Sequence, residues 1–94
     1  MGLDINGHRL NSYSGCDQIA ADARQHASGR GVAVLAYIAR TSEGEITQRD
    51  VDAAMDALRK VASSRKASAE QVALARLTIS RLNNARGSGR VILS

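Results

Sequence analysis

Residues 47–62 read TQRDVDAAMDALRKVA and contain the clearest helical pattern in the chain. Thr47 is followed three residues later by Asp50, a spacing typical of a helix N-cap. Residues 63–66, Ser-Ser-Arg-Lys, end the pattern. Charged side chains occupy one side of this predicted helix, and an apolar stripe at helical spacing occupies the other side and is expected to face a core. The stripe contains Val51, Ala54, Met55, Leu58, Val61 and Ala62.

The segment that follows predicts a second helix, over residues 69–86. Ser68 with Gln71 three residues later is a capping-box pattern. Residues 87–89, Gly-Ser-Gly, end this helix. The last residues, 90–94, form a short β-prone apolar run. It either pairs with the N-terminal part of its own chain or binds a partner, by adding as a strand to the partner's sheet or by docking into a groove.

Toward the N-terminus the pattern predicts a hairpin and two further helices. The pair Asn6-Gly7 within residues 3–10 favours a two-residue β-turn. Ser14, with Asp17 three residues later, predicts the start of a helix that ends at Gly29. Residues 32–39 are apolar on all sides, which indicates a buried element that is either helix or strand. Three alanines favour a helix.

These elements predict an all-α fold: a small bundle of three to four helices with a short N-terminal β-hairpin and an extended C-terminal tail. The 94 residues form a single helical domain. It divides into a hairpin or arm over 1–13, helices over 14–86, and a flexible apolar tail over 87–94. Val, Leu and Ile together number only twenty, a thin supply for a core, so we expect a homodimer.

Composition excludes several classes of protein. No apolar run approaches the ~18 residues of a membrane span, so no membrane partner is expected. No charged start leads into an apolar stretch, so no secretory signal is expected. The single cysteine excludes an internal disulfide, and we expect a cytoplasmic protein. Eleven arginines against two lysines suggest a GC-rich bacterial or phage genome.

Residues that carry chemistry in enzymes are few. Cys16 lies at a predicted helix start, where a thiol is activated, but Asp17 and Asp22 oppose a thiolate. His8 and His26 lie in separate elements and lack the spacing of metal ligands. We therefore expect no enzymatic activity, no cofactor and no metal.

Charge is divided unevenly along the chain. Residues 1–58 contain five basic and eight acidic side chains, whereas residues 59–94 contain eight basic and one acidic. The favoured interpretation is a small protein-binding module, such as an adaptor, chaperone-like factor or inhibitor, that recognises an acidic protein surface. Leu77 is predicted to point outward between arginines, a composition that interface centres favour. The expected contact residues are Arg76, Leu77, Arg81, Val91, Ile92 and Leu93.

The same basic segment allows two other interpretations. The charges are either merely solvated, or they contact phosphates of a nucleic acid bound by a dimeric regulator. The nucleic-acid interpretation uses Arg65, Lys66, Arg76, Arg81, Arg86 and Arg90.

Overall fold

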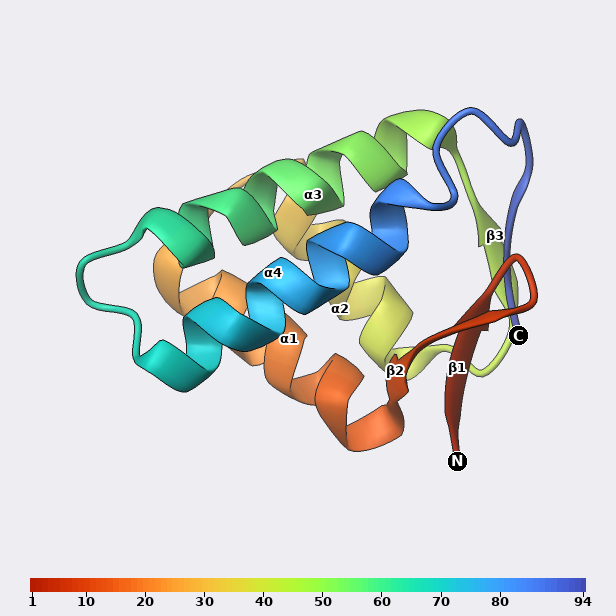
Figure 1. The fold of residues 1–94 in the computed structure, drawn as a ribbon. Coiled ribbons are helices and arrows are strands. Elements are labelled where there is room, and N and C mark those ends of the chain that lie inside the picture. Colours follow the sequence, from red (N-terminus) through yellow and green to blue (C-terminus); the bar gives the residue numbers. More distant parts are fainter.

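The computed structural model describes residues 1–94 and contains four helices and four short strands (Figure 1). More than half of the residues are helical, so the helical bundle is confirmed in outline. The all-α class is confirmed only in part, because the predicted hairpin belongs to a four-stranded antiparallel sheet. In chain order the elements are β1 (Gly2–Ile5), β2 (His8–Ser12), α1 (Tyr13–His26), α2 (Arg30–Arg40), β3 (Gly44–Ile46), α3 (Gln48–Ser63), α4 (Ala69–Asn83) and β4 (Val91–Leu93).

Both predicted capping boxes are present. Thr47 Oγ1 accepts a hydrogen bond from the Asp50 amide at 3.1 Å, and Asp50 Oδ2 accepts one from the Thr47 amide at 3.1 Å. Ser68 and Gln71 exchange the equivalent bonds at the start of α4, at 3.1 and 2.9 Å. These bonds satisfy amides that have no partner inside the helix, which explains why α3 and α4 begin where the sequence predicts.

Two helix boundaries differ from the sequence prediction. The start of α1 lies at Tyr13, because the Ser12 hydroxyl, and not Ser14, accepts the hydrogen bond from the Gly15 amide at 3.0 Å. The end of α4 lies at Asn83, three residues before Arg86. Residues 30–40 form α2, which confirms the helix over the alternative of a buried strand.

Helices α2 and α3 approach closely at Gly31. A Cβ atom built on Gly31 would meet the Ala53 carbonyl oxygen and the Cβ of Ala57, so only a glycine fits there without a shift. On its core side α3 buries Val51, Ala54, Met55, Leu58 and Val61, as the predicted apolar stripe requires. Ala62, the remaining residue of that stripe, is half-buried.

The four strands are ordered β2-β1-β4-β3 (Figure 1). Asn6 and Gly7 both have positive φ, at 48° and 82°, as the predicted hairpin turn requires. The C-terminal run is not a flexible tail, because β4 pairs with β1 and with β3. Of the two alternatives for this run, pairing with its own chain is therefore the one observed.

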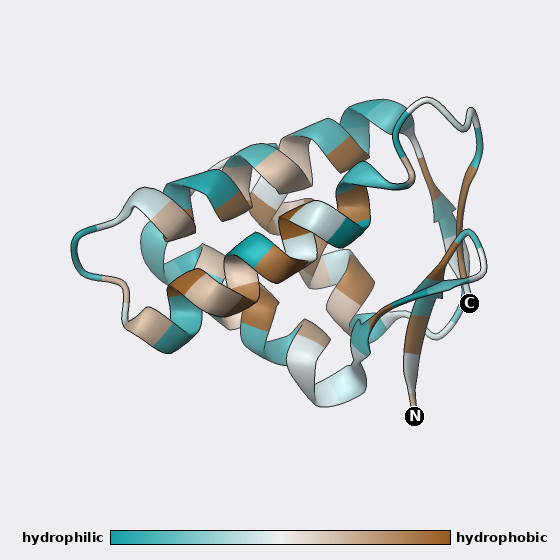
Figure 2. Ribbon diagram, viewed as in Figure 1, coloured by the Kyte–Doolittle hydropathy of each residue, from teal (hydrophilic) through white to brown (hydrophobic).

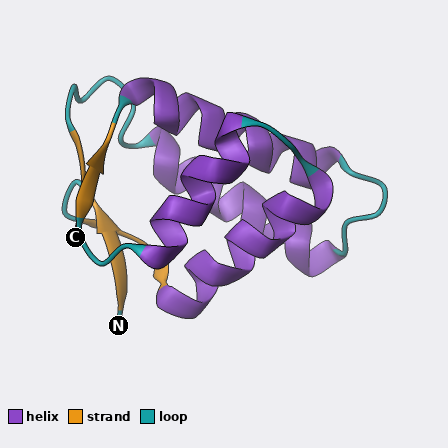
Figure 3. Cartoon of the chain, turned by 180° about the vertical axis from the view of Figure 1, so that it is seen from behind, coloured by secondary structure: helices purple, strands orange, loops and turns teal.

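One face of the sheet closes the end of the helical bundle. Figures 1 and 3 show the sheet and both termini at this end, and the loop between α3 and α4 at the opposite end. In Figure 2 apolar and polar residues alternate along the strands. The buried strand residues are Leu3, Ile5, Leu10, Ile46, Val91 and Leu93. No helix has the length and apolar character that crossing a membrane requires.

Candidate functional site

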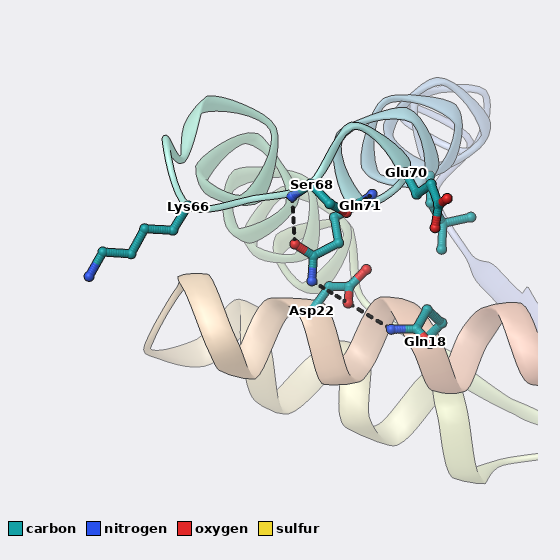
Figure 4. A pocket seen from close by; sticks show the side chains of 7 residues that line it. Gln18, Asp22, Lys66, Ser68, Glu70 and Gln71 are labelled. Atoms are coloured by element: carbon teal, nitrogen blue, oxygen red, sulfur yellow. Dashed lines mark hydrogen bonds between the residues drawn. The ribbon is translucent and has the colours of Figure 1, made fainter.

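An open cleft of about 540 Å³ lies between α1 and the start of α4 (Figure 4). Its lining is polar apart from one leucine. Helix α1 contributes two residues, and the loop before α4 together with the first turns of α4 contributes the others. The lining residues are Gln18, Asp22, Lys66, Ser68, Glu70, Gln71 and Leu74.

Asp22 is the central residue of the cleft. It is the only charged residue among the buried ones, with 3% of its surface exposed. Its Oδ1 atom accepts hydrogen bonds from Gln18 Nε2 at 2.8 Å and from Gln71 Nε2 at 3.1 Å. No ion pair in the structure includes Asp22. The nearby first turn of α4 carries the partial positive charge of a helix N-terminus, which compensates only part of a full negative charge.

Gln71 connects this carboxylate to the loop between α3 and α4. The Ser68 amide can only donate, so the Gln71 atom that accepts from it at 2.9 Å is the oxygen Oε1. His26 Nε2 lies 3.1 Å from the same oxygen and must therefore carry the proton. In the neutral imidazole, His26 Nδ1 then accepts a hydrogen bond from the Ser64 hydroxyl at 3.1 Å. This chain of bonds holds the start of α4 against the end of α1.

The two remaining charges of the cleft lie at its rim. Figure 4 shows the Glu70 side chain at one end of the cleft, and the Lys66 side chain extending away from both carboxylates. Glu70 is exposed and takes part in no ion pair. The cleft therefore presents two carboxylates that form no ion pair with Lys66 or with any other cation of the chain, a lining suited to hydrogen-bond donors and positive groups.

The predicted partner-binding residues do not form one surface. Arg76 and Leu77 are exposed on α4, where 45% of Leu77 is accessible. Arg81 is half-buried, because its Nη1 atom donates a hydrogen bond to the Leu10 carbonyl at 2.7 Å.

The tail residues were also assigned to the partner site, and for two of them the structure corrects this. Val91 is 0% exposed and Leu93 is 1% exposed, because both side chains lie on the face of the sheet that packs on the helices. Neither is accessible to a partner. Only Ile92, on the opposite face, is open to solvent, at 41%.

The predicted nucleic-acid residues are spread along the molecule. Arg86 pairs with Asp52 and Arg90 with Glu45, each at 3.1 Å, so both are engaged within the chain. Hydrogen bonds and the charge of Arg90 hold the pKa of Glu45 below its usual value. Arg65 and Lys66 in the α3–α4 loop and Arg76 in α4 are outside ion pairs.

Cys16 is buried, with 2% of its surface exposed. Burial, and next the charge of Asp17, raise the pKa of its thiol, while Arg9 lowers it to a smaller extent. The reactive thiolate is therefore disfavoured, and the side chain acts as a small apolar residue of the core. No group of three His, Cys, Asp or Glu side chains comes together in the geometry of a metal site.

The sequence interpretation missed the cleft, although one signal for it exists. Asp22 follows Ile19 by three residues and adjoins Ala23, so it lies on the buried side of α1. A carboxylate at an apolar-face position marks a charge that needs a partner. One partner, Gln18, lies four residues away on the same helix, a spacing that the sequence shows. The other, Gln71, lies 49 positions away, and no local pattern indicates it.

Comparison with known proteins gives no match to a protein-family model, a curated protein or a solved structure. No function is therefore transferred from a relative. The function proposed below rests on the accessible side chains and on their charges.

Proposed function

We propose that the chain is a small non-enzymatic protein-binding module that docks an acidic surface of another protein onto the outer face of α4. The observation that carries the proposal is Leu77, a large apolar side chain that is 45% exposed in the middle of this helix. Arg76 beside it is exposed and free of any ion pair. An accessible leucine next to an unpaired arginine is a composition that supports an interface.

The residues that surround Leu77 on α4 have small side chains and leave it accessible. Ala73 lies four residues before Leu77 and Ser80 three residues after it, so both share its face of the helix, and both are exposed. Small side chains around a leucine allow a partner to approach the helix closely. This favours contact with a surface that has an apolar recess for Leu77 and carboxylates for Arg76.

Charge supports an acidic partner. Five ion pairs use five of the thirteen basic and five of the nine acidic side chains. Eight cations and four carboxylates remain unpaired, and Arg76 is one of these cations. Complementary charge accelerates encounter and helps to exclude wrong partners.

A nucleic-acid interface is less well supported. Arg81, Arg86 and Arg90 are each bound to groups of the chain itself. Using them for phosphate contacts would require breaking these bonds first. Of the six predicted nucleic-acid residues, the unpaired Arg65, Lys66 and Arg76 then remain for phosphate contacts, fewer than the roughly six to ten that strong salt-dependent binding uses.

The test compares two matched double variants in quantitative protein capture from a bacterial lysate. Arg76→Glu with Leu77→Asp changes the proposed surface, whereas Arg49→Glu with Tyr13→Asp makes the same charge change at other exposed positions. We expect proteins captured by the wild type to be lost with the first variant and retained with the second. Identical capture by the wild type and the first variant would remove α4 as the docking face.

The alternative is measured directly by fluorescence anisotropy. Random duplex DNA and single-stranded RNA are titrated at ~50 and ~200 mM salt, a change worth orders of magnitude for proteins with many phosphate contacts. We expect no tight binding at either salt concentration. Tight binding at low salt that depends on Arg65, Lys66 and Arg76 would contradict the protein-binding function and favour a nucleic-acid regulator.

The homodimer expected from the composition stays a prediction. Light scattering coupled to size exclusion measures the oligomeric state. If the exposed face of α4 is used for self-association, the variant with Arg76→Glu and Leu77→Asp will be smaller than the wild type in that measurement.

A further inference from the structure

We propose that the cleft between α1 and α4 binds an organic cation, a guanidinium or alkylammonium group, between the free carboxylate oxygen of Asp22 and the carboxylate of Glu70. This site is separate from the exposed face of α4 around Leu77 and does not depend on the proposed function.

The first step is the unbalanced charge at the floor of the cleft. Only 3% of the surface of Asp22 is exposed, and yet no Lys, Arg or His forms an ion pair with it. Its only hydrogen-bond donors are the neutral amides of Gln18 and Gln71. A buried carboxylate without a counterion is costly, and the cost falls when a cation occupies the adjacent space.

The second step is the direction of the free oxygen. Both amides bind the same atom, Oδ1, and Figure 4 shows both dashed lines ending on one oxygen of Asp22 while the other points away from them. Oδ2 accepts no hydrogen bond from the protein, although the residue that carries it lines the cleft. A ligand with N–H groups supplies the missing donors.

The third step is the chemistry of the lining. Glu70 adds a second carboxylate, and Lys66 extends away from both (Figure 4). Anions are disfavoured by this charge, and apolar ligands by a lining in which Leu74 is the single apolar residue. Calcium needs six to eight oxygen ligands and magnesium an octahedral shell, whereas the carboxylates here are two. Guanidinium and ammonium groups need only a few acceptors and suit carboxylate pairs.

The fourth step is the size and openness of the cleft. The cleft has a volume of about 540 Å³ and is open to solvent, so a cationic head group enters without rearrangement of the helices. Gln71 is held by Ser68, His26 and Gln25, at 2.9, 3.1 and 2.9 Å, which keeps the floor of the cleft in place before a ligand arrives.

The experiment is an NMR titration of the full chain with methylguanidinium and n-butylammonium at low salt, with methylurea as the neutral isostere. We expect shifts of the Asp22, Glu70 and Gln71 amide resonances with the cations and none with methylurea. Asp22→Asn retains an oxygen for both glutamine amides and is expected to weaken cation binding at least about tenfold. Glu70→Gln, at an exposed position, is expected to weaken it about twofold to fivefold.

The matched control is Glu43→Gln, which removes an unpaired exposed carboxylate outside the cleft. Equal weakening by Glu43→Gln and Glu70→Gln would show attraction by overall charge only and would overturn the site. The absence of cation-dependent shifts in the wild type, or tighter binding of Mg²⁺ than of either cation, would also overturn it.

Two further ligands separate the sources of the cation. Binding of a blocked arginine, N-acetyl-arginine amide, as strong as that of methylguanidinium would indicate a side chain of another protein. Binding of spermidine that far exceeds that of the blocked arginine would indicate a free polyamine. Both results support the cation site and differ only in the molecule that carries the cation.

Discussion

Arg81 and Leu10 join α4 to the second strand: Arg81 Nη1 donates a hydrogen bond of 2.7 Å to the Leu10 carbonyl. The two residues are 71 positions apart in the chain. Arg81 thus has a structural role in the contact between the helices and the sheet, whereas Arg76 on the same helix has none.

This difference predicts opposite results for two arginine substitutions. Arg81→Ala removes a charged donor from a partly buried carbonyl and is expected to lower the free energy of unfolding by about 1–3 kcal/mol. Arg76→Ala, at an exposed position, is expected to change it by less than ~0.5 kcal/mol. Urea denaturation followed by circular dichroism measures both. Equal values for the two variants would mean that the Arg81 bond adds no stability.

Asp22 predicts a contrast between two substitutions at one position. Asp22→Asn removes the buried charge and keeps an oxygen for Gln18 and Gln71, so stability is expected to stay equal or to rise. Asp22→Ala leaves both amides without their acceptor and is expected to cost about 1–3 kcal/mol. Thermal denaturation of the two variants measures the difference. A loss in Asp22→Asn as large as in Asp22→Ala would show that the charge itself stabilises the fold.

Gly31 predicts a loss of stability from the addition of one methyl group. Alanine is the better helix former by about 1 kcal/mol, but its Cβ would meet the Ala53 carbonyl on α3. The free energy lost by moving α2 away from α3 is larger than the free energy gained from helix propensity. Gly31→Ala is therefore expected to destabilise the fold by roughly 1–3 kcal/mol. Ser80→Ala, on the exposed side of α4, is the control and is expected to be neutral or slightly stabilising. The urea concentration at the midpoint of denaturation measures the change in stability. A higher midpoint for Gly31→Ala than for the wild type would contradict the close contact.

Asp50 predicts how stability depends on pH. The hydrogen bond from the Thr47 amide, and then that from Arg30, hold the pKa of Asp50 below its usual value, against an opposing effect of burial. A group with a lowered pKa adds stability above its pKa in the unfolded chain, about 3.9 for aspartate. This stability is lost as the pH falls through the lower pKa of the folded state.

Thermal melts between about pH 7 and pH 2 measure this effect. The wild type is expected to lose stability below about pH 4, and Asp50→Asn to lose less over the same range because the linked group is gone. Glu43→Gln removes a carboxylate that is in no ion pair and serves as the charge control. The same acid dependence in Asp50→Asn as in the wild type would assign the effect to other carboxylates.

The helices were predictable because their signals are local. Capping pairs such as Ser68 with Gln71 lie three residues apart, and the stripe of α3 repeats within the helix itself. The hairpin turn at Asn6-Gly7 is equally local. Patterns of this kind locate an element and the side it buries, although at α1 the N-cap is Ser12 and not the predicted Ser14.

The sheet and the cleft were not predictable in the same way. Strands β3 and β4 contain three residues each, too few for an alternating pattern, and they pair across more than forty positions of sequence. The accessibility of Val91 and Leu93 depends on that pairing, so the sequence alone did not show that these two of the three tail residues are buried. Likewise the bond between Arg81 and Leu10 and the bond between Gln71 and Asp22 exist only after distant elements have packed.

The position of β4 has a consequence for how the sheet is assembled. The last strand of the chain lies between β1 and β3, and β3 has no other strand neighbour. The amide and carbonyl of Asp4 bond to Ser94 at 2.7 and 3.0 Å, so the first and last segments close a ring that spans almost the whole chain. Contacts of such high sequence separation form late, after the local helices. Residues 1–90 contain the four helices and the hairpin but not the strand that pairs with β3, so β3 can join the sheet only after residues 91–93 have been synthesised.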